Sequence, residues 1–506
     1  MLTLGQQKLD SLTLTVLAAV SAGAAVASVA APALLPWSFL ALAAAALVLY
    51  WSLRWEITLW AWIWILSYGL LDWPEWKLVI PGFFNMTVPR WLLLVTVAAF
   101  ALHFLLRGKR LRFDRAVLWA MLALTAYCAI SAARAGWLQD VPARVRGAPY
   151  FRLLGPLLFP YILFFLVYNA VEDDKHVRRA LIFLSLYAWY ALYIAYLQYA
   201  AVMGASAARS LIWPAYINSG DFGHHFDRAR GAFPASNAQA NVLLLTLFGN
   251  LFLIRRIRGP YRAALIVQAI LIPPAIFFTG LRSAYLAFVL CGVIWCIWGV
   301  SKGRLGKTKL AMAALAVVLG LAMFRANLSQ TRRSTGGVAQ TGPILARGIL
   351  AARTWEMVKR HPITGAGFGH FMEADRKIPR DPATLAGFPQ ATTNATPSNL
   401  FLVMVAETGI VGLALMVLVF LSIFHLSCRL YGKLPSTDEG EPGRHFVVLF
   451  WIALTIYLTD ATFVDPLWDV PSNGLFWAFA GLMAGNYRLL ESQAASPKAA
   501  PGGPDR

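Results

Sequence analysis

The run VPRWLLLVTVAAFALHFLL, residues 88–106, decides the fold class of this chain. An α-helix rises about 1.5 Å per residue, so a run of this length can cross a hydrocarbon core of about 30 Å. Backbone groups inside lipid must pair within their own helix, and the run therefore predicts a membrane-spanning α-helix. The basic stretch RGKRLRFDR follows at 107–115 and marks where the chain leaves the membrane.

Similar apolar runs of about 17 to 25 residues recur along the whole chain, and each is long enough to span a bilayer. They predict an all-α fold, a polytopic transmembrane helical bundle with about fourteen spans. The boundaries are soft by a few residues. The spans are 11–31, 34–52, 55–72, 88–106, 116–135, 153–170, 179–203, 239–254, 263–279, 283–300, 308–325, 399–427, 446–462 and 470–486.

The composition excludes a soluble protein. Hydrophobic residues make up 59% of the 506 positions and charged residues 13%, which is too few to keep a globular surface wet. The net charge of +20 would suggest nucleic acid in a soluble protein. Here most of the basic residues fall in short connections between spans, where membrane orientation and anionic headgroups explain them. Membrane lipids, and no nucleic acid, are therefore the expected surroundings.

Three short connections, 107–115, 255–262 and 302–309, are strongly basic and should face the cytoplasm. The number of spans between them is even each time, so the three assignments agree and place both termini in the cytoplasm. The longer connections then lie outside, in the periplasm of a bacterium-like cell. They comprise 136–152, 204–238 and 326–398.

The chain shows no internal repeat, so we expect one polytopic membrane domain over 1–490. Its large outer loops cover about 204–238 and 326–398. The tail, 491–506, is rich in Ala, Pro and Gly, and its composition predicts a disordered cytoplasmic segment.

The outer loop 326–398 carries more positive than negative charge, against the orientation bias, which suggests an anionic ligand. Its segment 343–362 repeats apolar side chains along one helical face, as in a helix that lies on the membrane plane. That face holds Leu345, Ile349, Ala352 and Trp355. The basic residues are Arg332, Arg333, Arg347, Arg353, Lys359, Arg360, Arg376, Lys377 and Arg380, against Glu356, Glu373, Asp375 and Asp381.

Two outer segments present arginine at a helix end. The first is DRARGAFPASNAQAN, 227–241, in which Arg228 and Arg230 either snorkel to the interface or bind a ligand. The second is TGLRSA, 279–284, a tight hairpin between two spans. Its connecting loop is so short that Arg282 must stay at the end of the helices. A guanidinium held at the mouth of a bundle offers a rigid fork of donors that matches a phosphate or diphosphate.

Two further segments close the pattern. GAGFGHF, 365–371, is a glycine-rich turn that lacks the Lys and Ser/Thr of a P-loop. PSNLFLVMVAETGIVGL, 397–413, opens a span and places Glu407 about 13 Å below Ser398, inside the bilayer.

In order and spacing, these four segments resemble the O-antigen ligase and O-antigen (exopolysaccharide) polymerase superfamily of bacterial membrane enzymes, over about 215–420. RARGAFPASNAQA is similar to the family's arginine, glycine and asparagine pattern before a span, and TGLRSA to its Ser/Arg hairpin. RTWEMVKRHPITGAGFGHF resembles the family's loop helix and glycine turn, and the segment from Pro397 its closing Glu-Thr-Gly motif. The resemblance implies a GT-C-like helical fold.

The resemblance also implies a glycosyltransferase of the inner membrane, active at the periplasmic face without metal or cofactor. Its donor would be a glycan on undecaprenyl diphosphate, and its acceptor a hydroxyl of a glycan or of lipid A-core. Such a transfer releases a lipid diphosphate, whose growing charge fixed cations can stabilise. The residues expected to bind it are Arg282 with Arg228 or Arg230.

The chain departs from the family at Ser398, which stands where the closing motif usually has a histidine that activates the acceptor. Serine is a poor general base at neutral pH. The open candidates for the base are His370, His224, His225 and Glu407, unless the transfer needs little base assistance or uses another acceptor.

A transporter or flippase for lipid-linked saccharides is the main alternative. It should show paired halves and broken helices near the membrane midplane, and the sequence shows no such repeat. A purely structural subunit does not explain Arg282 and Glu407. Polymerase and ligase use the same donor and differ in acceptor; the absent histidine and the number of spans favour a polymerase.

Overall fold

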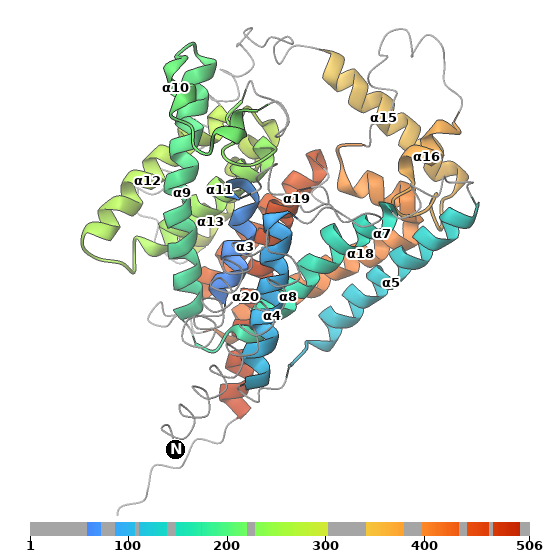
Figure 1. Cartoon of the computed structure of the whole chain (residues 1–506). Helices are drawn as coiled ribbons and strands as arrows, with labels where there is room; N and C mark the ends of the chain where they lie inside the picture. Colours follow the sequence, from blue (N-terminus) through green and yellow to red (C-terminus); the bar gives the residue numbers. More distant parts are fainter. Residues whose placement is uncertain are drawn as a thin grey trace, which may run out of the picture.

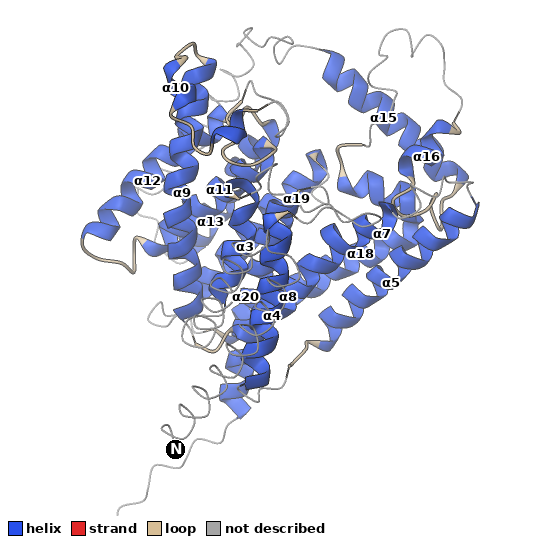
Figure 2. Cartoon of the chain, in the orientation of Figure 1, coloured by secondary structure: helices blue, strands red, loops and turns tan. Residues whose placement is uncertain are grey.

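A computed structural model of the chain describes ten segments, and within them it contains helices, turns and no strand (Figures 1 and 2). This confirms the predicted all-α fold class. The predicted spans 11–31, 34–52 and 308–325 lie outside the described residues. The described residues are 58–71, 87–106, 111–138, 148–173, 175–219, 228–301, 341–378, 397–434, 443–464 and 469–495.

Seven helices in the described segments are long and apolar enough to cross a membrane, and the chain is a multi-pass membrane protein. The run at 88–106 forms α4 over the predicted residues. The others differ from the predicted spans by a few residues at each end. The seven are α4 (Val88–Leu106), α5 (Arg115–Leu138), α9 (Lys175–Val202), α12 (Pro260–Phe278), α13 (Arg282–Ser301), α18 (Leu400–Lys433) and α19 (Arg444–Phe463).

Other predicted spans take different forms. The span predicted at 153–170 consists of three consecutive pieces, because a π-helical segment with Gly155 and Pro156 interrupts the α-helical geometry. The last helix extends through Ala495, so the first residues of the predicted tail are helical. These elements are α3 (Thr58–Leu70), α7 (Ala148–Leu153), η2 (Leu154–Leu158), α8 (Phe159–Ala170), α11 (Ser236–Leu253) and α20 (Val470–Ala495).

Helix α11 lies at the centre of the bundle. It packs against α9, α12, α13, α19 and α20, and every residue of it except Leu251 is buried. An α-helix buried on all sides has no polar face to spare, so its asparagines and glutamines must find partners inside the protein. The side chains at its first turns therefore define a polar centre.

The packing of α20 on α8 depends on two glycines. A Cβ on Gly481 would lie 2.6 Å from the carbonyl oxygen of Phe164, and one on Gly485 would lie 2.9 Å from that of Tyr168. Small residues four apart let two membrane helices approach closely. The pair α8 and α20 thus forms a rigid support beside the polar centre.

The two ends of the bundle differ. At one end lie two short helices, α10 (Ala207–Ser210) and the 3-10 helix η3 (Ala215–Asn218). The same end, at the top of Figure 1, carries α15 (Thr341–Arg360) and α16 (Phe371–Arg376). We call it the loop end.

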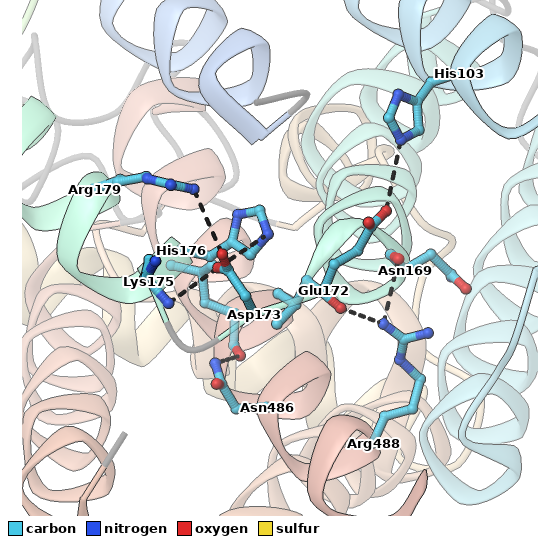
Figure 3. A network of polar contacts seen from close by, with 11 residues as sticks. His103, Asn169, Glu172, Asp173, Lys175, His176, Arg179, Asn486 and Arg488 are labelled. Atoms are coloured by element: carbon cyan, nitrogen blue, oxygen red, sulfur yellow. Dashed lines mark hydrogen bonds and ion pairs between the residues drawn. The ribbon is translucent and has the colours of Figure 1, made fainter. Parts of the chain in front are cut away.

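We call the opposite end the basic end. There Arg488 of α20 donates to the carbonyl oxygens of Asn169 and Val171, at the turn between α8 and α9. In the same network, Nε2 of His103 on α4 lies 3.7 Å from Glu172 (Figure 3). These contacts tie the ends of α4, α8 and α20 together, away from the helix ends that carry the candidate site.

Candidate functional site

The turn that precedes α11 holds two of the predicted arginines. The backbone N–H of Ala229 donates to the carbonyl oxygen of Phe278 at 2.9 Å, at the end of α12. Oε1 of Gln198 on α9 accepts from the backbone N–H groups of Arg230 and Gly231, at 2.9 and 2.8 Å. The turn is therefore fixed to both α9 and α12.

The glycine in this turn is required by its conformation. Gly231 has φ +64°, and a Cβ there would lie 2.0 Å from Oε1 of Gln239. The amide of Gln239 in turn donates to the carbonyl oxygen of Ala191 on α9, at 2.9 Å. The Arg-Gly pattern of the sequence thus reflects a left-handed turn against a buried glutamine.

A cavity of about 190 Å³ opens beside this turn, and three arginines line it: Arg209, Arg228 and Arg230. The guanidinium of Arg230 is buried and donates to the carbonyl oxygen of Ile217. Burial lowers the pKa of Arg230 to about 10, so the side chain is still charged at neutral pH. The other lining residues are Gln198, Ala201, Val202, Ile212 and Asn218.

Arg282 is the first residue of α13 and is exposed. The hydrogen bond from Ala229 to Phe278 places the α12–α13 turn next to the turn of Arg228 and Arg230. The three arginines thus come from adjacent turns, but Arg282 does not line the cavity of the other two. A common diphosphate site for the three stays a prediction.

Two carboxylates lie at the loop end of α19 and α20, and the sequence reading did not single them out. Nδ2 of Asn237 donates to Asp469 at 2.7 Å and lies 3.5 Å from Asp460. Nδ2 of Asn241 donates to Asp460 at 2.8 Å, and the hydroxyl of Ser472 donates to Asp469. We call these five residues the carboxylate cluster.

The environment of Asp469 favours its protonated form. Burial, reinforced by the neighbouring Asp460, raises the pKa of Asp469 to about 7, although hydrogen bonds from Ser472 and Asn237 oppose the shift. A carboxyl group with this pKa exchanges its proton near neutral pH. Such a value is typical of general acids and bases.

The closing motif of the sequence lies beside this cluster. Ser398 is exposed, and Asn399 caps α18 by accepting a hydrogen bond from the backbone N–H of Leu402 at 2.9 Å. Nδ2 of Asn399 donates to the carbonyl oxygen of Thr462, at 2.8 Å. Thr462 follows Asp460 by two residues on α19, so the position expected to hold a histidine is close to the carboxylates.

The span predicted at 399–427 is not one regular helix. Gly409 has φ 67° and ψ −169° inside α18, and the glycine-rich turn packs into the break. The backbone N–H of Ala366 donates to the carbonyl oxygen of Ala406 at 2.9 Å, and that of Gly367 to the oxygen of Glu407 at 2.8 Å. The predicted span therefore forms as α18 with a break at Gly409, where backbone N–H groups of the glycine-rich turn bind the carbonyl oxygens of Ala406 and Glu407.

Glu407 lies at this break and is fully buried. One carboxylate oxygen pairs with the guanidinium of Arg152 on α7, and the other accepts from the backbone N–H of Gly369 at 3.0 Å. The Arg152 guanidinium lies 5.2 Å from the ring centre of Phe368. The sequence reading missed Arg152, since nothing in the chain order links it to a residue 255 positions away.

Helix α5 holds the same glycine-rich turn from another side. The guanidinium of Arg134 donates to the hydroxyl and carbonyl oxygens of Thr364, at 2.8 and 3.2 Å, and to the carbonyl of Gly365 at 3.1 Å. The hydroxyl of Ser131 accepts from the backbone N–H of Phe368 at 3.2 Å. The turn is therefore a wedge between α5, α7 and α18, and we call it the glycine wedge.

Of the three histidines proposed as bases, His370 is the one in the described segments. His370 precedes α16 and is buried, and its Nδ1 has no hydrogen-bond partner within the described segments. Among these segments no hydrogen bond or ion pair links it to the carboxylate cluster. His224 and His225 lie outside the described residues.

Helix α15 forms in the segment where the sequence predicts the loop helix. It packs through Met357 and Val358 into a small core with Phe371 and Ala406, while Trp355 is 60% exposed. The predicted apolar face therefore includes an unpacked tryptophan, as expected for a helix at a membrane surface. Its position in the membrane stays a prediction.

Part of the chain matches a known protein family. Residues 240–417 match the family described as O-antigen ligase, which confirms the resemblance predicted from the sequence motifs. The matched range includes Arg282, Ser398 and Glu407 and ends before the two carboxylates. No curated protein matches the chain.

Proposed function

We propose that this multi-pass protein of the O-antigen ligase family moves a glycan from undecaprenyl diphosphate to a sugar hydroxyl at the loop end. The family implies a glycosyltransferase-like ligase or polymerase that acts in polysaccharide biosynthesis. The donor, the acceptor class and the membrane face are the proposal. The resemblance to the family implies them, and the positive charges and the cavity of the loop end support them.

The cavity lined by Arg209, Arg228 and Arg230 is the observation that carries the proposal. A diphosphate is a dense anion, and guanidinium groups bind its oxygens through paired donors. The buried guanidinium of Arg230 is held by fixed contacts, so it need not reorganise when charge develops on the leaving group. The proposal assigns Arg282, on the adjacent turn, to the same lipid headgroup.

The proposed reaction is a displacement at the anomeric carbon of the donor sugar. The acceptor oxygen forms a bond to that carbon and gives up its proton. The bond between the carbon and the diphosphate oxygen breaks, and its electron pair leaves with undecaprenyl diphosphate. The arginines stabilise the charge on the departing diphosphate, and no metal ion is required for this role.

Glu407 fits a positioning role in this reaction better than proton transfer. Both of its oxygens are occupied, one by Arg152 and one by the N–H of Gly369. Its role is to hold the glycine wedge in the break of α18.

The basic end is proposed to face the cytoplasm, which puts the loop end in the periplasm and the protein in the inner membrane. Arg255 contacts His445 there, and Lys433 pairs with Glu491 at 2.9 Å. Positive charge at one end of a helical bundle marks the cytoplasmic side. Because α20 runs toward this end, the C-terminus would be cytoplasmic, and we propose the same for the N-terminus.

The acceptor is proposed to be the sugar hydroxyl of a growing glycan, which makes the product an O-antigen or exopolysaccharide. A ligase would use lipid A-core as the acceptor at the same site. The exposed Ser398 in place of a histidine favours the polymerase.

The test compares cells that depend on this protein for polymer. In cells that carry Arg282→Ala or Arg228→Ala, we expect undecaprenyl-linked repeat units to accumulate and long polymer to fall about 100-fold or more. Arg258→Ala, an exposed arginine at the basic end, is the matched control and should leave the polymer unchanged. Wild-type polymer with the two loop-end variants would contradict the proposal. Accumulation of donor only on the cytoplasmic leaflet would favour a flippase.

A further inference from the structure

The two aspartates of the carboxylate cluster, of which Asp460 is buried and Asp469 half-buried, differ from the other buried acids of the described segments. Glu407 pairs with Arg152, and Asp375 pairs with Arg353 at 2.7 Å. No cation contacts Asp460 or Asp469 in the described part of the chain. A buried carboxylate without a cation is energetically unfavourable and is retained where it has a task.

The donors around the pair are all neutral. They are the amides of Asn237 and Asn241, and the hydroxyl and backbone N–H of Ser472. Both amides approach Oδ2 of Asp460, and no donor in the described residues reaches its Oδ1. This oxygen therefore has an open acceptor position.

The cluster lies between the two parts of the proposed site. Asn237, Asn241 and Asp460 line a narrow recess together with Leu281 and Ser283, the residues on either side of Arg282. Asn399 reaches the same end of α19 from the other side, through the carbonyl of Thr462. Asp460 thus lies between the turn of Arg282 and the segment that begins at Ser398.

We propose that the Asp460–Asp469 pair binds the acceptor hydroxyl and that Asp469 accepts its proton, which replaces the histidine absent at Ser398. This inference rests on the proposed glycosyl transfer and adds the residue that activates the acceptor. It concerns residues C-terminal to the stretch that matches the family.

The step balances with the groups at hand. The acceptor O–H bond breaks as the oxygen bonds to the anomeric carbon, and the proton passes to a carboxylate oxygen of Asp469. The electron pair of the broken glycosyl–phosphate bond leaves on the lipid diphosphate. The protonated Asp469 then releases its proton to water at the loop end, and the pair is ready for the next acceptor.

Accessibility divides the roles within the pair. Asp469 is half-buried at the start of α20, whereas Asp460 is buried within α19 and accepts from an asparagine amide. Asp469 can therefore meet both the acceptor and water. Asp460 is the titratable group that faces it, and the remaining partners from α11 and α20 are neutral. The burial that raises the pKa of Asp469 to about 7 makes it a base of suitable strength at neutral pH.

The test uses the purified full-length protein in lipid nanodiscs with an undecaprenyl-diphosphate-linked repeat unit and a glycan acceptor. We expect Asp469→Asn to lower kcat by on the order of 100-fold or more, with donor affinity unchanged. Asp469→Glu should keep part of the activity. The wild-type rate should rise as pH increases through about 7, because ionised Asp469 is the active form. The rate of Asp469→Asn should not show this rise.

Ser472→Ala gives a milder second variant. It removes a hydrogen bond that stabilises ionised Asp469, so the midpoint of the rise in rate with pH should move to higher pH. The control is Glu356→Gln, a partly exposed acid on α15, which should change neither rate nor midpoint.

The outcomes separate the two claims. If the wild-type protein makes no glycosidic bond, the proposed function and this inference both fail. If it transfers glycan while Asp469→Asn keeps the wild-type rate and pH profile, only the assignment of Asp469 is overturned. A pH midpoint that Ser472→Ala leaves in place would also overturn it.

Discussion

Two carboxylate sites lie at the same end of the bundle and have opposite surroundings. Glu407 is fully enclosed and paired with Arg152 and a backbone N–H. Asp460 and Asp469 have only neutral donors. A buried carboxylate that pairs with a guanidinium leaves an uncompensated charge if either partner is removed, so the pair holds its surroundings in place. A carboxylate that is bound only by amides and a hydroxyl can take up and release a proton during a reaction. The comparison separates a positioning site from a reactive one.

The largest expected effect comes from breaking the first site. Glu407→Ala should lower the free energy of unfolding by about 3–5 kcal/mol, because it leaves the buried guanidinium of Arg152 without its counter-charge. Thermal unfolding of the purified protein in detergent, followed by intrinsic tryptophan fluorescence, measures the loss.

A double variant shows whether the loss comes from the unpaired charge. Glu407→Gln with Arg152→Met removes both charges and should recover most of the stability. As a control, Glu356→Ala breaks a partly exposed pair on α15 and should change stability by less than about 1 kcal/mol. If Glu407→Ala unfolds at the wild-type temperature, the ion pair is not what holds the glycine wedge.

A smaller effect should follow from changing the break in α18. Gly409 has φ 67°, and a Cβ there would lie 2.1 Å from the carbonyl oxygen of Ile363. Gly409→Ala should therefore destabilise by about 1–3 kcal/mol and expose the glycine wedge to limited proteolysis. Gly432 lies in the same helix with open space around it, so Gly432→Ala is the matched control. Equal proteolysis of the two variants would show that the wedge does not depend on the break.

The smallest effect is expected at Ser398. If the carboxylate pair already supplies the base, Ser398→His should change the transfer rate by less than about threefold. The acceptor hydroxyl has one proton to lose, so a second base adds little to the rate. Ser398 is exposed, so we expect the substitution to leave folding unchanged. A gain of about 100-fold would mean that the chain lacks a base and that Asp469 does not act as one.

The helices could be predicted from the sequence, because an apolar run long enough to span lipid has few alternatives. The run at 88–106 forms α4 as expected. The break in α18 could not be predicted from length and hydropathy, which treat Gly409 as another apolar position. Only the packing of the glycine wedge shows why its positive φ is tolerated.

The arginines of the candidate site were visible in the sequence because each stands at the end of an apolar run. The aspartates were not, since single acids near the ends of the last spans resemble ordinary solvated ends. Their partners come from α11, more than 200 positions away. The available signal was Asp460 inside an apolar run, followed by Asp469 and Asn473 within a short stretch.

One measurement tests the central claim, that loop-end residues transfer a glycan by displacing a lipid diphosphate. Proteoliposomes that contain the full-length protein would receive a donor labelled in both the glycan and the undecaprenyl diphosphate. The account predicts one undecaprenyl diphosphate released for each new glycosidic bond, and loss of both products with Arg282→Ala. Intact donor that crosses the bilayer with no bond broken would contradict it.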